Sequence, residues 1–272
     1  MISNTTYVVD AHAHIFERSL AMVDGRRYTP DRDALLSEYL DQLDQNGFTH
    51  GVLVQPSFLG VNNDYLLAAL RNHPDRLRGV AVVDPCIGSD GLAALRDQGI
   101  VGVRMNLPGR AIPDFRAGPW PGLQERLHRL GLHVEVHCES SELQNVLPSF
   151  IVAGNTIVID HFGRPDPVLG MEDPGLRYLL STASTGQVWV KLTAAYRLGR
   201  GDAASFTQSP VARSLISAMG TRRLVWGSDW PHTQLTGKID FRKSRRLLDE
   251  LVPDPDAQRR ILGESAKELF RL

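Results

Sequence analysis

Short apolar runs alternate with longer segments of helical period along almost the whole chain, and this alternation limits the fold more than any other feature. Each run is bounded by Gly, Pro or Asp. Most runs are continuously Val, Ile or Leu, which is typical of parallel strands covered on both faces. The runs predict eight strands, at residues 7–12, 50–55, 77–83, 101–106, 133–138, 156–161, 187–192 and 223–227.

Helical segments are expected between the strands, at residues 31–46, 64–72, 90–98, 123–130, 141–153, 176–185, 205–219 and 241–251, with a closing helix at 254–272. Eight strands and their helices in 272 residues favour one α/β domain over residues 1–272, a (β/α)8 TIM barrel. An open nucleotide-binding sheet would need a Gly-rich phosphate turn, and the sequence has none. Insertions at 17–30 and 107–122 follow strand ends, on the face where barrels build their sites.

The charge balance excludes several classes of partner. Thirty Lys and Arg against 31 Asp and Glu give a net charge of −1, so no bulk basicity favours nucleic acid or an anionic membrane. No apolar run approaches the ~20 residues that span a bilayer, and no targeting segment is recognisable. Cys86 and Cys138 are far apart and predict no disulfide framework. We expect a soluble cytoplasmic protein; its oligomeric state cannot be read from the sequence.

Polar residues gather at the predicted carboxyl ends of the strands. His12 and His14 lie one residue apart on the first strand, so their imidazoles share one face. Other polar residues at strand ends are Gln55, Ser57, Arg104, Asn106, His137, Asp160, His161, Arg164, Lys191, Arg197, Ser228, Asp229 and His232. Buried ionisable groups need a partner or a function. Either His137 or His161 alone is more typical of a core histidine, whereas four histidines and one aspartate at the same end of four strands indicate a site.

Several motifs occur in one order along the chain. They are His12-Ala13-His14, Arg26-Arg27-Tyr28-Thr29-Pro30, Val54-Gln55-Pro56-Ser57, Gly102-Val103-Arg104-Met105-Asn106-Leu107 with Arg110, His137, Asp160-His161-Phe162-Gly163-Arg164, Val188-Trp189-Val190-Lys191 with Tyr196-Arg197, and Trp226-Gly227-Ser228-Asp229-Trp230-Pro231-His232. Together they resemble the amidohydrolase superfamily, its amidohydrolase-2 branch, and the lactonases similar to 2-pyrone-4,6-dicarboxylate hydrolase. The resemblance covers nearly the whole chain and implies an amidohydrolase-type barrel.

The resemblance also raises a question about metal. His12, His14, His137 and Asp229 match superfamily ligands for a divalent ion, and one ion, with zinc favoured, is the expectation. A second ion is not expected, because Arg104 stands where binuclear members have a bridging lysine or glutamate. The alternative is no metal. The dicarboxylate lactonases that the chain resembles work without one and carry a tyrosine at the position of His137.

The implied reaction is the hydrolytic opening of a lactone ring. Asp229 would act as general base toward the attacking water and then as general acid toward the leaving oxygen. His161, together with His12 and His14, would stabilise the developing oxyanion, whether or not a metal assists.

Four arginines predict an anionic substrate. Arg104, Arg110, Arg164 and Arg197 follow strand ends on the expected catalytic face, and guanidinium groups match carboxylates with a two-pronged fork. A small carboxylated lactone is therefore expected. Tyr28 and Ser57 resemble substrate contacts of the family, although Tyr28 equally fits an apolar lid residue.

Two other functions stay open at this point. Related amidohydrolases with the same ligand set are metal-dependent decarboxylases of aromatic or muconate-type acids, and release of carbon dioxide would identify one. A non-enzymatic binding protein on a barrel scaffold would have no need for Asp229 beside a histidine cluster.

Overall fold

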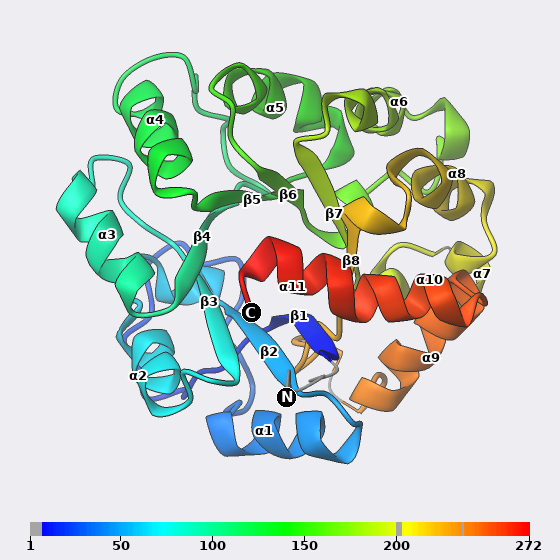
Figure 1. The fold of residues 1–272 in the computed structure, drawn as a ribbon, viewed down its shortest axis with the longest axis horizontal. Helices are drawn as coiled ribbons and strands as arrows, with labels where there is room; N and C mark the ends of the chain where they lie inside the picture. Colours follow the sequence, from blue (N-terminus) through cyan, green and yellow to red (C-terminus); the bar gives the residue numbers. More distant parts are fainter. Residues whose placement is uncertain (1–6, 200–202, 236) are drawn as a thin grey trace, which may run out of the picture.

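The fold is an eight-stranded parallel barrel, seen in a computed structural model that describes residues 7–199, 203–235 and 237–272 (Figure 1). The strands follow one another around the sheet in chain order. They are β1 (Val9–Ala13), β2 (His50–Val54), β3 (Leu77–Ala81), β4 (Ile100–Asn106), β5 (His133–His137), β6 (Ile157–Ile159), β7 (Val188–Thr193) and β8 (Leu224–Gly227). This architecture confirms the predicted TIM barrel.

Helices surround the strands (Figure 1). The main ones are α1 (Leu36–Gln45), α2 (Asp64–Asn72), α3 (Ser89–Asp97), α4 (Trp120–Leu130), α5 (Leu143–Val152), α6 (Pro174–Ser181), α7 (Ala203–Thr207), α8 (Pro210–Met219) and α9 (Phe241–Leu251). A continuous helical segment then runs through α10 (Pro255–Arg259), a π-helical turn (Arg260–Glu264) and α11 (Ser265–Phe270).

The helix expected from residue 31 begins only at Leu36. The preceding segment instead pairs with the loop after β1, because Phe16 and Ala34 exchange backbone hydrogen bonds of 2.9 and 2.8 Å. This short antiparallel bridge ties down both ends of the insertion at 17–30, whose side chains include Tyr28 of the site.

The helix expected at 205–219 is divided. Ser209 caps α8 by accepting a hydrogen bond from the Ala212 N–H, and Pro210 occupies the first helical position. A proline there lacks the N–H that a continuous helix would require, so α7 and α8 are separate helices.

The core has two parts. One lies between the barrel wall and the surrounding helices. The other fills the barrel with side chains such as Val9, Val52 and Val158, and it includes Phe270 of α11. Figure 1 shows α11 lying across one open end of the barrel. The Phe270 ring lies 5.7 Å from the ring of His133 and 5.8 Å from Lys191 Nζ. The helix therefore closes this end of the barrel and leaves the carboxyl ends of the strands for a site.

The barrel closes between β1 and β8, directly at the histidine pair. The Asp229 N–H donates to the His12 carbonyl at 2.9 Å, and the His14 N–H donates to the Trp230 carbonyl at 2.8 Å. Gly227 allows this close approach, since a Cβ there would lie 2.6 Å from both the Cβ and the backbone nitrogen of His12. The closure places the histidines of β1 beside Asp229.

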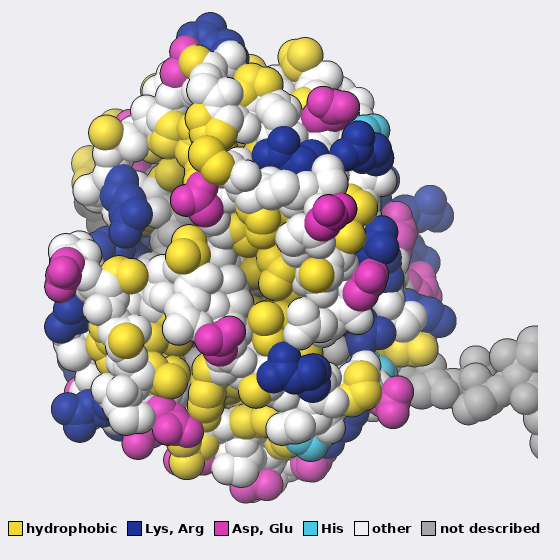
Figure 2. Space-filling model, turned by 90° about the vertical axis from the view of Figure 1, so that its left-hand side faces the viewer, with side chains coloured by type: hydrophobic (Ala, Val, Ile, Leu, Met, Phe, Trp, Pro, Cys, Tyr) yellow, Lys and Arg dark blue, Asp and Glu magenta, His cyan; other side chains and the backbone are white. Residues whose placement is uncertain are grey.

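Surface features agree with the charge balance. On the face shown in Figure 2, basic and acidic side chains are interspersed rather than gathered by sign. Within the described ranges, no helix is both long and apolar enough to cross a membrane.

Replacing Gly227 by Ala is expected to lower the free energy of unfolding by about 1–3 kcal/mol, because the added methyl group overlaps the backbone of His12. The measurement is chemical denaturation. Gly122→Ala in α4 is the matched control, because its Cβ would meet only the flexible end of Arg126, 3.0 Å away. Equal stability of the two variants would show that β1 and β8 have room to separate.

Candidate active site

A cavity of about 440 Å³ opens at the carboxyl ends of the strands. The expected site residues that line it are His14, Tyr28, Ser57, Arg104, His137, His161, Arg164, Arg197 and Asp229. His12 is fully buried beneath it. Arg110 lies exposed in the loop after β4 and is not part of the lining. The structure thus brings together all the expected site residues except Arg110.

The floor of the cavity is formed by His12, His14 and Asp229. Nε2 of each histidine lies 3.8 Å from Asp229 Oδ1. One ligand-type atom from each residue falls within 4.8 Å of the others, and all three residues are buried. This buried cluster could bind a metal ion. His12, Asp160 and His161 form a second group of this kind, and His137 belongs to neither group.

Hydrogen bonding defines the tautomer of His14. Its Nδ1 lies 2.7 Å from the Val54 carbonyl oxygen, which can only accept, so Nδ1 carries the proton. Burial lowers the pKa of His14 to about 3, and the ring is neutral at ordinary pH. Nε2 therefore presents a lone pair toward Asp229 and the cavity.

Asp229 is held as an anion at the point where the chain turns away from β8. Its backbone has φ of +60°, and Oδ2 accepts a hydrogen bond of 2.6 Å from the Tyr196 hydroxyl. Arg197 Nε lies 3.3 Å from the same oxygen. Burial by itself would raise the pKa of Asp229, but its neighbours, with the Arg197 guanidinium first among them, outweigh burial and hold the pKa far below its usual value. Oδ1 remains directed toward the histidines.

His161 and His137 border the cavity on the adjoining strands. The Thr193 hydroxyl lies 2.7 Å from His161 Nδ1, and burial lowers the pKa of His161 to about 3. Arg104 Nη2 lies 3.3 Å from His137 Nδ1. Asn106 Oδ1, which can only accept, lies 3.1 Å from the same Nδ1, so the two neighbours require opposite protonation of this atom and do not define the tautomer of His137. Nε2 of His137 has no hydrogen-bond partner within the described part of the chain.

Behind the histidines, the barrel encloses two ion pairs. Arg104 donates to Asp160 Oδ2 at 2.9 and 2.7 Å, and its Nε lies 3.4 Å from Glu135. Lys191 Nζ lies 2.5 Å from Glu135 Oε2 and 3.2 Å from His12 Nδ1. Burial opposes the charge of Asp160, yet Arg104 and its other neighbours keep the pKa of this carboxyl well below its usual value.

The arginines differ in how far they are already neutralised. Arg104 is bound to Asp160. Arg164 donates to both carboxylate oxygens of Glu139, at 3.1 and 2.9 Å. Arg197 lies against Asp229 and donates to the Thr233 carbonyl at 2.8 Å. The expectation that these four arginines bind the substrate anion is therefore modified: of the four, Arg104, Arg164 and Arg197 reach the cavity, and each has a protein carboxylate beside it.

Sequence reasoning missed Arg27 as a site residue. Arg27 lines the cavity beside Tyr28, and across the described ranges its side chain has no hydrogen bond or ion pair. The position of Arg27 in the insertion after the first strand, next to Tyr28, could have indicated that it belongs to the site. Tyr196, which binds Asp229, was also missed; it precedes Arg197 in the motif after β7.

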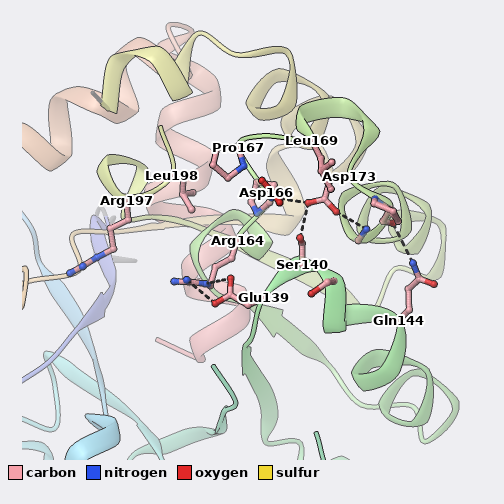
Figure 3. Close-up of a pocket in the computed structure, with 14 residues that line it drawn as sticks. Glu139, Ser140, Gln144, Arg164, Asp166, Pro167, Leu169, Asp173, Arg197 and Leu198 are labelled. Atoms are coloured by element: carbon pink, nitrogen blue, oxygen red, sulfur yellow. Dashed lines mark hydrogen bonds and ion pairs between the residues drawn. The ribbon is translucent and has the colours of Figure 1, made fainter. Parts of the chain in front are cut away.

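A second cavity, of about 610 Å³, lies beside the first and shares Arg164 and Arg197 with it. Figure 3 shows Arg164 turned toward Glu139 at the boundary. Asp173 holds the loops of this cavity by accepting hydrogen bonds from the Ser140 hydroxyl at 2.6 Å and the Asp166 N–H at 2.8 Å. These hydrogen bonds hold in place the loops that carry Glu139 and Arg164.

The chain is similar to known proteins over nearly its whole length. The sequence model of the amidohydrolase family (amidohydrolase-2) matches residues 9–272. A 2-pyrone-4,6-dicarboxylate hydrolase of Comamonas testosteroni is 30% identical over 96% of this chain and 89% of its own. A 4-sulfomuconolactone hydrolase of Hydrogenophaga intermedia is 27% identical over 96% and 88%.

A solved structure, a probable 2-pyrone-4,6-dicarboxylic acid hydrolase of Acinetobacter baumannii with citric acid bound, superposes with a TM-score of 0.92 at 38% identity. The match covers 97% of this chain and 99% of that one. With the barrel, the histidine pair and Asp229 in place, the chain belongs to the amidohydrolase family, in the group that includes the 2-pyrone-4,6-dicarboxylate hydrolases.

Proposed function

We propose that this chain is a lactone hydrolase, and that its substrate is a small carboxylated lactone of the 2-pyrone-4,6-dicarboxylate type. The observation that carries the proposal is the pairing on the cavity floor. An ionised Asp229 faces the unprotonated Nε2 of a neutral His14 at 3.8 Å, beneath walls that carry arginines. The names of the relatives support the substrate class. We also propose that the chain functions as a single barrel domain.

The attacking water would bind between Asp229 and His14. Both Oδ1 and the His14 Nε2 accept hydrogen bonds, so one water can donate to both and keep a lone pair for the lactone carbonyl. As the C–O bond forms, the proton passes to Asp229. When the ring C–O bond breaks, Asp229 returns that proton to the leaving oxygen, and the product is the ring-opened acid.

The negative charge on the carbonyl oxygen would be stabilised by imidazole N–H groups. His137 would take part in the tautomer in which Nδ1 accepts from Arg104 and Nε2 carries the proton. At His161, the Thr193 hydroxyl accepts the backbone N–H at 3.3 Å and can donate to Nδ1, which leaves a proton on Nε2. Donors fixed in this way cost no reorganisation as the charge develops.

A divalent ion, with zinc the expected one, would be held by His12, His14 and Asp229, whose ligand atoms lie close enough together. When bound it would lower the pKa of a coordinated water toward ~7. His14 fits this role, because its Nε2 lone pair is free and its Nδ1 proton is bound to a carbonyl. His137, the fourth ligand expected from sequence, lies outside the group.

The direct test is incubation with 2-pyrone-4,6-dicarboxylate, with the product identified by mass spectrometry. Hydrolysis adds one water to the substrate, whereas the decarboxylase alternative releases carbon dioxide. Unchanged substrate that nonetheless binds would indicate the binding-protein alternative.

Replacing Asp229 by Asn should lower kcat by about 10²–10⁴-fold, because the base is lost while the carbonyl donors remain. Asn tolerates the positive φ at this position, so the fold should be retained. Asp240→Asn is the matched control; Asp240 caps α9 outside the cavity, and Asn is an equally good cap. Near-wild-type turnover of the Asp229 variant would remove the assigned role.

Replacing Arg27 by Met should raise KM for a dicarboxylated lactone by about 10–100-fold, the effect of losing one or two charged hydrogen bonds. KM for an uncharged lactone should change much less. Arg110→Met is the control, because Arg110 does not line the cavity. Steady-state kinetics on both substrates provide the comparison, and equal effects of the two variants would show that Arg27 does not bind the substrate anion.

The acid limb of kcat/KM should lie well below pH 6.5, the ordinary histidine pKa, because burial lowers the pKa of His14 and His161 to about 3.

The unfolded chain gains protons on these histidines below pH 6.5 while the folded chain does not. Their contribution to folding stability is therefore complete above pH 6.5 and is lost as the pH falls toward 3. Rate profiles and denaturation midpoints over the same pH range test both statements; an acid limb at pH 6.5 with the fold intact would contradict the first.

A further inference from the structure

Lys191 of β7 is fully buried, and the mechanism above does not use it. Its ammonium group lies between Glu135 Oε2 at 2.5 Å and His12 Nδ1 at 3.2 Å, with Asp160 Oδ1 4.0 Å away. Two carboxylates therefore lie beside the ammonium group. A lysine in this position is a hydrogen-bond donor directed at the back of His12.

An ammonium group has three donors and no acceptor. The contact with His12 therefore makes Nδ1 the accepting atom and leaves the ring proton on Nε2. Asp160 Oδ1 lies 3.3 Å from the same Nδ1 but has no hydrogen-bond partner within the described ranges. Nε2 of His12 is buried, has no hydrogen-bond partner among the residues that the structure describes, and lies 3.8 Å from Asp229 Oδ1. His12 thus presents an N–H to the catalytic carboxylate.

The groups behind the other histidines give a comparison. A metal-ligating histidine almost always donates its second ring N–H to a carboxylate, a backbone carbonyl or water. His14 follows this rule through the Val54 carbonyl. His12 does the opposite, because Lys191 donates to its Nδ1, whereas Nδ1 of His137 lies between the donor Arg104 and the acceptor Asn106 Oδ1. Of the two histidines grouped with Asp229, only His14 has the hydrogen bonding typical of a metal ligand.

We propose that Lys191 is a positioning residue that keeps the ring proton of His12 on Nε2, on the side that faces Asp229, and thereby weakens the metal site of His12, His14 and Asp229. The proposal rests on the role proposed for Asp229, but its test requires no substrate. Metal binding at His12 would require Nε2 to give up its proton. The His12 ring would then either lose the hydrogen bond that Lys191 donates to Nδ1, or carry a proton on Nδ1 that faces the Lys191 ammonium group.

Without Lys191 the same ring would have a different partner. An Nδ1 proton could be donated to Asp160 Oδ1, 3.3 Å away, and the Nε2 lone pair would then face Asp229. The histidine would acquire the carboxylate backing that is common in zinc sites. Removing the lysine is therefore expected to strengthen zinc binding, the reverse of what removing a neighbour of a metal site normally does.

The variants follow from the charge pairing. Lys191→Met alone leaves Glu135 buried without its cation, so it is combined with Glu135→Gln, which removes both charges. Glu135→Gln alone is the matched control, because Lys191 remains there to donate to His12. Zinc affinity of the metal-free proteins is measured by competition with a chromogenic chelator, and NMR of the imidazole nitrogens locates the ring proton of His12.

We expect the double variant to bind zinc about 10–100-fold more tightly than the wild type and the Glu135→Gln control, which is the usual size of effects from groups behind a ligand. The His12 proton should lie on Nε2 in the wild type and move to Nδ1 in the double variant. Equal zinc affinity in all three proteins, or an Nδ1 proton on wild-type His12, would overturn the proposal. If the double variant does not fold, the wild-type NMR measurement still decides.

Discussion

The pairing of charges inside the barrel is the constraint on which the site depends. Arg104 on β4, Glu135 on β5, Asp160 after β6 and Lys191 on β7 are each no more than 4% exposed and lie within ion-pair distance of one another. A buried charge without its partner costs several kcal/mol, so each of these side chains holds the others in one arrangement. Because the four strands each contribute one group, the network also fixes how their carboxyl ends stand relative to one another.

Two histidines of the site are hydrogen-bonded to this network. His12 is hydrogen-bonded to Lys191 and His137 to Arg104, whereas His14 is bound to a backbone carbonyl. The three rings therefore differ in the donors and acceptors behind them: a donor at His12, an acceptor at His14, and one of each at His137. Three imidazoles of the same pocket are thereby given different chemistry. In our proposals, His14 helps to hold the water, His137 stabilises the oxyanion, and His12 steadies Asp229.

The protein carboxylates beside the arginines also change what these arginines can bind. An arginine near an active site suggests a carboxylate clamp, but Arg104, Arg164 and Arg197 each have a protein carboxylate close by. A substrate carboxylate at these groups must share or displace a protein partner, and this costs part of the interaction. Arg27 has no such competitor among the described residues and, in our proposal, gives a bound anion the larger net gain.

The sequence by itself determined the barrel, the face of the barrel that carries the site, and most of the residues in it. These follow from local rules: strand periodicity places His12 and His14 on one face, and parallel strands bring their polar ends to one edge, so His161 and Asp229 could be predicted beside them. The tertiary structure alone decided the partners. Lys191 contacts Glu135 and His12, and Arg164 contacts Glu139. Arg110 lies outside the cavity, whereas Arg27 lines it. The spacing of these residues along the chain does not predict these contacts. Ion pairs and tautomers depend on distances between side chains from different strands, and those distances exist only once the barrel has closed.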